Sequence, residues 1–180
     1  MRSTDTRQHI VDAALALVAD RGYSATSVDE IAAAAGVAKG SVFYNFGSKA
    51  ELFEAIIAEG VDRLTATLRG AAQGAHGRDA VEALVTELLT QVRDHPDFAK
   101  VMVAEVFRTG RRWQDSIRSL RDDAIGVFAA AVADAWPDRD PSLTAAALFG
   151  ATVVAGLEWL VFQPERSLDE VRTAVLAAVR

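Results

Sequence analysis

The sequence has no cysteine, only four prolines and only three histidines among its 180 residues. The absence of cysteine excludes disulfides, thiolate zinc sites, iron–sulfur clusters and cysteine nucleophiles. The histidines, His9, His76 and His95, lie far apart, and no pair has the close spacing of a helical zinc motif. We therefore expect no metal site and no cofactor.

The signatures of common enzyme classes are also missing. The chain contains no phosphate-binding loop, no G-x-S-x-G nucleophile elbow and no dinucleotide fingerprint. Single carboxylates could still perform acid–base chemistry, but no feature of the sequence selects a pair of them. The sequence therefore predicts a protein that is not an enzyme.

Positive charge is not in excess either, because 19 basic residues face 25 acidic ones and give a net charge of -6. The excess of acid lies entirely in residues 50–180, whereas residues 1–49 hold five basic and five acidic side chains. A neutral segment on an acidic body can bind phosphates at a few placed contacts. We expect it to bind polyanions weakly when there is no sequence-specific contact.

The N-terminal MRSTDTRQHI has no apolar signal core, so export is not indicated. One long apolar run does occur, from Leu143 to Phe162, and it is long enough to cross a bilayer. Against a membrane span, Glu158 lies within the run and no cluster of Lys or Arg flanks it. Because such a helix is equally expected in a protein core or subunit interface, we predict a cytoplasmic protein without a membrane partner.

Strand-like alternation is scarce, and apolar residues recur at helical spacing along almost the whole chain. The pattern predicts an all-α fold of about nine helices. Gly22 ends the first helix, Ser27-Val28-Asp29-Glu30 is a capping box that begins the second, and the glycine-rich residues 70–78 form a linker. The predicted helices cover approximately residues 5–20, 28–35, 39–46, 48–68, 81–95, 98–106, 113–135, 143–162 and 168–179.

The strongest local signal is a pair of short helices joined by Ala35-Gly36-Val37-Ala38. Gly36 permits the left-handed backbone at which the chain reverses, as in a helix–turn–helix. The second helix, 39–46, can pack its apolar residues inward while Tyr44 and the polar residues face outward. Such an outer face suits the major groove of DNA, but a corner in an ordinary helical bundle gives the same pattern. The residues alone leave both interpretations open.

Residues 10–54 also resemble a known DNA-binding domain. Their landmarks, among them Gly22-Tyr23, Thr26-Ser27, Ala35-Gly36-Val37 and Lys49, are similar to those of the tetracycline-repressor (TetR) family. The resemblance implies a homodimeric, ligand-responsive transcription factor, usually a repressor that a small molecule releases from a palindromic DNA operator. It also implies a helix-turn-helix DNA-binding domain at 1–50, connected by helix 48–68 to a ligand-binding and dimerisation domain at 51–180.

The resemblance assigns individual residues to the DNA interface. Ser27 would cap a helix near the DNA backbone, and Lys49, in the first turn of the connecting helix, would hold a phosphate. The residues that would face the groove or its rim are Lys39, Gly40, Ser41, Tyr44 and Asn45.

Three residues depart from the family's pattern. Ala38 stands where a polar residue is frequent, which removes a helix cap and a potential phosphate contact. Phe43 stands where tyrosine is usual, so that one hydroxyl is missing. Asn45 replaces the common histidine, and its amide could read adenine with two hydrogen bonds or touch a phosphate. The changes leave the fold as expected but bear on operator affinity and preference.

Apolar residues of the second half could line a ligand cavity between helices, and simple filling of the core is an equally good interpretation for each. Glu105 lies among them, where an acid could select a cation or a polar group of a ligand, or could lie on a solvated helix edge. The predicted partner is a small, largely apolar molecule. The candidates for its site are Phe98, Met102, Glu105, Val106, Trp113, Phe128 and Phe149.

Small residues repeat at four-residue spacing within Leu143–Phe162, which lets another helix come close. Together with the apolar stripe of residues 168–179, the run suits a four-helix bundle built from two helices of each of two subunits. The family uses its last two helices in this way, although burial inside one subunit is the other interpretation. The interface candidates are Leu157, Trp159, Leu160, Leu168, Val171 and Val175.

Two functions are thus compatible with the sequence. The first is a ligand-responsive repressor that binds double-stranded DNA as a homodimer. The second is a ligand-binding or interaction protein on the same scaffold, in which the changes at Ala38, Phe43 and Asn45 have abolished specific DNA reading.

Overall fold

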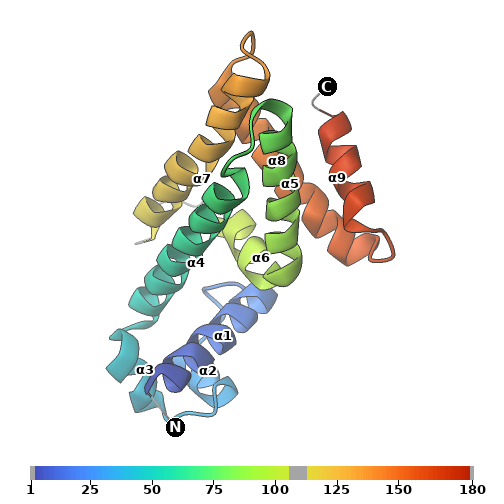
Figure 1. Ribbon diagram of the computed structural model, residues 1–180. Coiled ribbons are helices and arrows are strands. Elements are labelled where there is room, and N and C mark those ends of the chain that lie inside the picture. The colour runs from blue at the N-terminus through green and yellow to red at the C-terminus, as the bar shows by residue number, and fades with distance from the viewer. Residues whose placement is uncertain (1–2, 106–112, 179–180) are drawn as a thin grey trace. The chain divides into compact units, whose positions relative to one another are not determined.

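The computed structural model describes residues 3–105 and 113–178, and all regular secondary structure in these ranges is α-helical (Figure 1). The prediction of an all-α fold is confirmed. The helices described are α1 (Ser3–Arg21), α2 (Val28–Ala34), α3 (Lys39–Phe46), α4 (Lys49–Ala72), α5 (Gly77–Asp94), α6 (Pro96–Glu105), α7 (Gln114–Ala135), α8 (Pro141–Phe162) and α9 (Leu168–Ala177).

The chain forms two compact units. Unit 1 comprises residues 1–60 and 100–117, and unit 2 comprises residues 61–99 and 118–180. Helices α4, α6 and α7 therefore contribute residues to both units. Unit 1 contains the segment 1–50 that the sequence assigns to DNA binding, together with residues that the sequence assigns to the other domain.

Glycines and a capping box set where the helices of unit 1 begin and end. Gly22 follows α1 with φ 81° and Gly36 follows α2 with φ 67°, a left-handed conformation that glycine adopts without strain. Ser27 is the N-cap of α2. Its hydroxyl accepts a hydrogen bond from the Glu30 amide, and the Glu30 carboxylate accepts one from the Ser27 amide. Both turns and this capping box are as the sequence predicts.

The core of unit 1 lies between the inward faces of its first four helices, with α1 against α2 and α2 against α3. The fully buried side chains include Ile10, Ala14, Ile31, Val42, Leu52 and Ile57. An aromatic cluster extends this core beside the α1–α2 loop. The Tyr23 ring lies edge-on to Phe53 and to Trp113, with ring centroids 5.0 Å and 4.7 Å apart. The loop before α2 is thus packed against large apolar rings.

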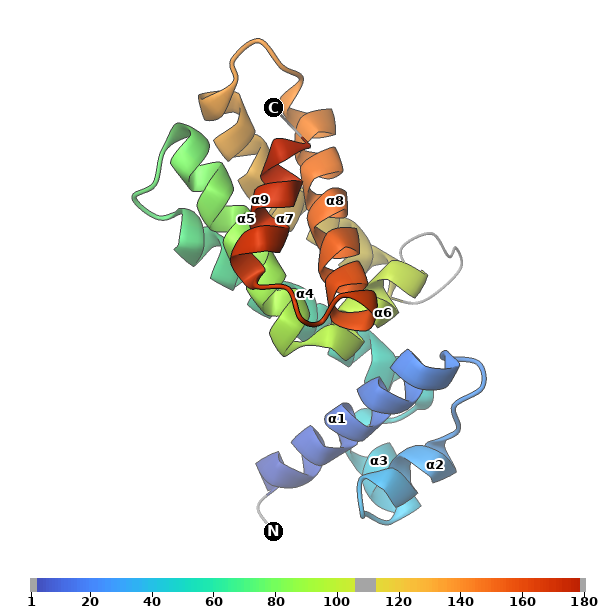
Figure 2. The ribbon, with the colours of Figure 1, turned by 90° about the vertical axis from the view of Figure 1, so that its right-hand side faces the viewer.

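In unit 2, α5, α8 and α9 lie side by side (Figure 2). Gly156 of α8 faces α5, where a Cβ atom would lie 2.9 Å from Val92 Cγ1 and 3.4 Å from Leu89 Cδ2. Carbon atoms normally stay farther apart than the first of these distances. The missing side chain at Gly156 therefore sets how closely α5 and α8 approach.

The glycine-rich segment predicted as a linker is mostly helical. α4 continues to Ala72 and α5 begins at Gly77, which leaves only residues 73–76 between them. Ala71 and Ala72 favour continuation of α4, and the Asp134 carboxylate of α7 accepts a hydrogen bond from the first amide of α5 at Gly77. The sequence prediction of a nine-residue linker is therefore wrong at both ends.

α8 contains the long apolar run. Among the described residues it is the one helix whose length and composition would allow it to cross a membrane. One face is buried within the chain and consists of Ala145, Leu148, Thr152, Gly156 and Trp159. The opposite face exposes Leu143 (72%), Val154 (61%) and Phe162 (71%). α8 is therefore packed on one side only and leaves an apolar face uncovered in the single chain.

Candidate nucleic-acid interface

α3 has a face anchored in the core and a face open to solvent. Val42 and Phe46 are buried, whereas the Tyr44 side chain is 89% exposed and Phe43 is also exposed. The N-cap residue is Ala38, which makes no side-chain hydrogen bond to the helix, as the sequence predicts. The buried face thus anchors α3, and the large Tyr44 ring projects into solvent from the other face.

Two of the predicted groove residues, Gly40 and Asn45, differ in whether they are free of contacts within the protein and so open to DNA. A Cβ atom placed on Gly40 would meet no atom within 4 Å, so this part of α3 is open to close approach. The Asn45 Nδ2 donates to the Ser41 carbonyl at 2.8 Å. Reading adenine with two hydrogen bonds would use Oδ1 and the second N–H of the same amide, whose orientation the bond to Ser41 fixes. The role of Asn45 stays a prediction.

An ion pair links the first turns of α2 and α3. The Lys39 Nζ lies 2.9 Å from Asp29 Oδ2, and both side chains are more than half exposed. Because an exposed pair of this kind is weak, Lys39 can exchange the carboxylate for a DNA phosphate at little cost. Asp29 was not predicted, since ten residues separate the partners and no helical periodicity relates them.

Ser27 is exposed and its hydroxyl is engaged in the cap of α2. Hydrogen bonds from the Ser27 hydroxyl and backbone amide hold the pKa of Glu30 below its ordinary value, and the nearby charge of Arg21 acts in the same direction. The cap therefore works with Glu30 ionised. Closeness of Ser27 to the DNA backbone stays a prediction.

Lys49 lies at the start of α4, as the sequence predicts, but its ammonium group faces the protein. Nζ donates to the Tyr23 carbonyl at 2.7 Å and to the Thr26 carbonyl at 2.6 Å. It also lies 4.1 Å from the centroid of the Tyr23 ring, within the range of a cation–π contact. These partners are 26 and 23 residues away in the sequence, so no local pattern could have predicted them.

A second cation, Arg7 of α1, ties α1 to two other helices of unit 1. Its guanidinium group donates two hydrogen bonds to the Glu59 carboxylate of α4 and lies 5.0 Å from the centroid of the Phe46 ring of α3. The Glu59 carboxylate raises the pKa of Arg7. Arg7, like Lys39 and Lys49, therefore has partners inside unit 1.

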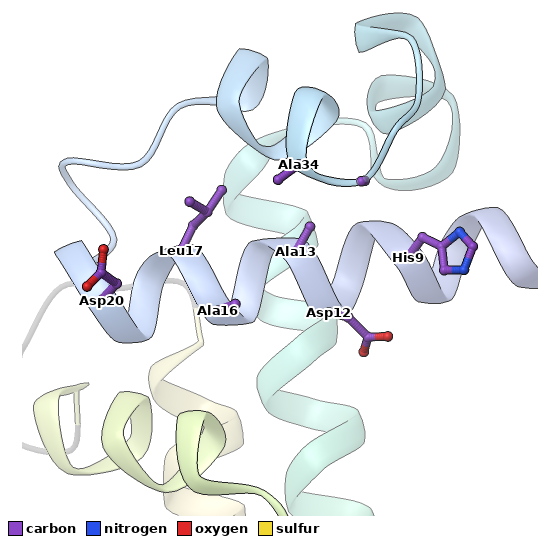
Figure 3. A pocket seen from close by; sticks show the side chains of 8 residues that line it. His9, Asp12, Ala13, Ala16, Leu17, Asp20 and Ala34 are labelled. Atoms are coloured by element: carbon purple, nitrogen blue, oxygen red, sulfur yellow. The ribbon is translucent and has the colours of Figure 1, made fainter.

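A groove of about 620 Å³ lies between α1 and α2. Figure 3 shows Ala13 and Leu17 of α1 pointing toward Ala34 of α2, with Asp12 pointing away from α2. The complete lining is His9, Asp12, Ala13, Ala16, Leu17, Asp20, Ala34 and Ala35. Two carboxylates, with no Lys or Arg among the lining residues, repel phosphate. This groove is therefore not part of the candidate DNA surface.

The anchored α3, the turn at Gly36 and the capped α2 form a helix–turn–helix with its second helix exposed. Residues 10–56 match the family model described as bacterial regulatory proteins, tetR family. The chain belongs to the TetR family. The resemblance stated from the sequence is confirmed, and the all-helical architecture with an N-terminal helix–turn–helix is that of TetR-like folds.

Relatives of the TetR family differ in how much of the chain they match. The transcriptional regulator AcrR of Shigella flexneri is 50% identical over 52 residues, which are 29% of this chain and 24% of that protein. A TetR-like transcriptional regulator from Rhodococcus sp. RHA1 superimposes with a TM-score of 0.83 at 27% identity, covering 99% of this chain and 95% of the other. FadR of Bacillus subtilis, solved in complex with stearoyl-CoA, gives a TM-score of 0.79 at 17% identity over 96% of each chain.

The sequence matches and the structural superpositions support different conclusions. This chain spans about a quarter of the length of the curated regulators that it matches first. The sequence likeness to these two regulators covers 29% and 30% of this chain. At 17% identity, the likeness to FadR shows the fold alone. The TetR family consists of transcriptional regulators and not of enzymes.

Three of the predicted ligand residues lie in unit 1. Met102, Glu105 and Trp113 are buried there. With 3% exposure, Glu105 is not on a solvated helix edge, so that interpretation is wrong. Trp113 packs against Tyr23 and Phe53, next to the DNA-binding helices. The ring that was predicted to touch a ligand therefore contacts the α1–α2 loop.

The other described ligand candidates lie in unit 2. The rings of Phe128 and Phe149 meet edge to face with centroids 5.6 Å apart, and Phe98 is half-buried. Val106 lies outside the described residues. A groove of about 530 Å³ in unit 2 has other lining residues: Arg69, Ala72, Gln73, Ala75, His76, Ala80, Val127, Ala130, Ala131 and Asp134. The ligand role of all these candidates stays a prediction.

The predicted interface residues divide by burial. Trp159, Val171 and Val175 are buried within the chain, and the Trp159 indole donates to the Arg166 carbonyl at 2.9 Å. Leu157, Leu160 and Leu168 are half-buried. The predicted interface residues do not include the exposed apolar residues of α8, which are Leu143, Val154, Val161 and Phe162. The four-residue repeat could not tell which face of α8 the rest of the chain covers.

Proposed function

We propose that this chain is a cytoplasmic transcriptional repressor that binds a palindromic operator as a homodimer and leaves it when a small, largely apolar molecule binds. The observation that carries the proposal is the exposed face of α3. Buried Val42 and Phe46 anchor the helix, and they leave Tyr44 89% exposed beside the open surface at Gly40. A helix held in this way can enter the major groove.

The proposed DNA contacts lie on α3. Tyr44 and Ser41 meet base edges or phosphates, Gly40 lets the sugar–phosphate backbone come close, and Lys39 leaves Asp29 for a phosphate. Non-specific attraction is small because residues 1–49 are neutral. Binding therefore depends on placed contacts and on two copies of α3 acting together.

The uncovered apolar face of α8 supports the homodimer. Leu143, Val154 and Phe162 are exposed on it, and Ala147 and Ala151 lie exposed between them. An apolar face of this kind requires a cover, and its alanines let a second helix approach closely. A second copy of α8 supplies both in a two-fold arrangement. The proposed interface thus uses this exposed face in place of the buried Trp159, Val171 and Val175.

Ligand control follows from the need for two recognition helices about 34–36 Å apart, in successive major grooves. A ligand that binds better to a state with another spacing releases the DNA, and only its difference in affinity between the two states can do so. The buried aromatic residues of both units support an apolar ligand. Stearoyl-CoA is a suitable first probe, because a protein of similar fold was solved with it.

Selection of bound duplexes from a randomised DNA library tests the proposal, with full-length protein at low and moderate salt. We expect an inverted repeat whose half-sites lie one helical turn apart, or a multiple of it. The Tyr44→Ala variant should lose at least about tenfold in affinity for the selected duplex with unchanged thermal stability. Val103→Ala, which truncates an exposed residue of α6, is the matched control and should bind like the wild type.

The outcome that contradicts the proposal is recovery of no motif by protein that is folded and dimeric. The Ser41-bonded Asn45 amide and the uncapped Ala38 would then be the features that disable DNA reading. The chain would in that case be a ligand-binding or interaction protein on a TetR scaffold. Addition of stearoyl-CoA to the wild-type complex tests release separately, and tighter DNA binding with this probe would reverse the sign proposed for the ligand.

A further inference from the structure

The ammonium group of Lys49 binds the loop between α1 and α2. It donates to the carbonyls of Tyr23 and Thr26, at 2.7 Å and 2.6 Å, and lies over the Tyr23 ring. We call this arrangement of Lys49, Tyr23 and Thr26 the Lys49 clasp. Charged hydrogen bonds of this length are among the stronger contacts within a protein. The clasp joins the first turn of α4 to the loop between α1 and α2.

The clasp holds the loop at the point where α2 begins. Thr26 immediately precedes the N-cap residue Ser27. Thr26 is itself buried, and its hydroxyl donates to the Gly22 carbonyl at 3.0 Å. The Thr26 carbonyl therefore has little freedom once Lys49 binds it. The position of the first turn of α2 follows from that of α4.

Two other aromatic rings hold the Tyr23 ring of the Lys49 clasp in place. The Tyr23 ring meets Phe53 of α4 and Trp113 edge-on, with centroids 5.0 Å and 4.7 Å apart. The ring cannot turn away from the ammonium group without losing these contacts. Lys49 thus binds a preformed surface of two carbonyls and a ring face.

The orientation of α2 passes to α3 through two kinds of contact. The helices pack against each other, and Lys39 of α3 pairs with Asp29 of α2. A shift of the loop at Thr26 would therefore move α2 and, with it, the exposed side chains of α3. Displacements of about 1 Å are enough to weaken placed contacts strongly.

We propose that Lys49 is a positioning residue that sets the orientation of the recognition helix, in place of the phosphate contact predicted from the sequence. This proposal rests on the proposed DNA-binding function. Its ammonium group donates to the Tyr23 and Thr26 carbonyls and lies over the Tyr23 ring, so it faces the protein. A phosphate would have to compete with these partners for the same group.

The dependence of DNA affinity on salt separates the two roles of Lys49. Each phosphate contact adds about 0.9 to the slope of log affinity against log salt concentration. The Lys49→Met variant keeps the length of the side chain and removes its charge. We expect it to bind the duplex selected by the wild type about tenfold more weakly, with an unchanged slope. Its affinity for a scrambled duplex of the same length should be unchanged.

Lys39→Met is the matched control, because Lys39 is the proposed phosphate ligand. Its slope should fall by about 0.9, and its affinity for the scrambled duplex should fall as well. The proposal is overturned if Lys49→Met behaves like Lys39→Met, or if it binds the selected duplex as tightly as the wild type.

A second variant keeps the test decisive where Lys49→Met does not fold. Tyr23→Leu retains the charge of Lys49 and removes the ring below it. By itself it should lose specific affinity with an unchanged slope. Where Lys49→Met folds, adding it to Tyr23→Leu should weaken binding by less than it does in the wild type. Additive losses, with a smaller slope only when Lys49 is replaced, contradict the clasp. A wild type that selects no duplex contradicts the proposed function and is distinguishable from all these results.

Discussion

The two units of this TetR-family protein differ in the contacts that hold the helices of each unit together. In unit 1, three basic side chains, Arg7, Lys39 and Lys49, join helices by binding acidic, carbonyl or aromatic partners. In unit 2, apolar packing joins α5, α8 and α9 and brings α5 and α8 closest at Gly156, while ion pairs such as Arg172–Glu82 and Arg69–Asp123 add to it. Unit 1 thus uses basic side chains to hold α3 in place. Unit 2 leaves an apolar face that a second copy can cover.

The largest effect is expected from a charge on the exposed face of α8. Val154 is 61% exposed, so Val154→Asp leaves the fold of unit 2 intact but places a carboxylate in the proposed dimer interface. The variant should be monomeric in sedimentation equilibrium and bind the selected duplex at least about 100-fold more weakly, because the second half-site contact is lost.

Val103→Asp is the control for that experiment, since Val103 is an exposed valine on α6. It should remain dimeric. A dimer that survives Val154→Asp would show that the apolar face of α8 is not the contact between subunits.

The next effect tests the close packing of α5 on α8. Gly156→Ala places a Cβ atom 2.9 Å from Val92 Cγ1, so it should lower the free energy of unfolding by about 1–2 kcal/mol in urea titration. Gly126→Ala in α7 meets no atom within 4 Å and should raise it by about 0.5–1 kcal/mol, as alanine favours a helix. Equal effects at the two glycines would contradict the packing argument.

A smaller effect is expected at the cap of α2. Ser27→Ala removes the hydroxyl that holds the Glu30 amide and should lower Tm by about 3 °C at neutral pH. Because the cap lowers the pKa of Glu30 in the folded state, its stabilisation is present above the ordinary carboxyl pKa and is lost as the pH falls through the lowered value. The difference in Tm between variant and wild type should therefore shrink on acidification. A difference that is the same at pH 3 and pH 7 would exclude the charged form of the cap.

The smallest effect concerns the ion pair between α2 and α3. Asp29→Asn releases Lys39 and removes a carboxylate beside the proposed phosphate site. Affinity for a scrambled duplex, measured by fluorescence anisotropy at low salt, should rise about two- to fivefold. The same substitution at Asp12, on the groove between α1 and α2, should leave this affinity unchanged. A rise at both positions would indicate a general effect of net charge.

The sequence could predict those features that depend on residues close together in the chain. Apolar periodicity, the turns at Gly22 and Gly36 and the cap at Ser27 depend on residues within one or two helical turns, and the structure has them where they were expected. The contacts that arrange the site were not accessible in this way. Lys49 and Tyr23 are 26 residues apart, and Lys39 and Asp29 are ten apart.

The same distinction holds for α8. Gly150 belongs to the small-residue repeat, yet a Cβ atom there would meet nothing within 4 Å, whereas one on Gly156, which lies outside the repeat, would collide with Val92 of α5. Which face of an apolar helix is covered depends on the partners that the rest of the chain supplies. Trp159 was therefore placed in the interface by pattern, whereas the structure buries it inside the chain.

Hydroxyl-radical footprinting of the full-length protein on the selected duplex shows whether two α3 helices read the DNA together. We expect two protected patches on one face of the DNA, about 10 base pairs apart or a multiple of this spacing, because each subunit places one α3 in the major groove. Protection should disappear with Tyr44→Ala at the same protein concentration. A single protected patch, or protection that persists without the Tyr44 ring, would contradict the claim that two exposed α3 helices read the DNA together.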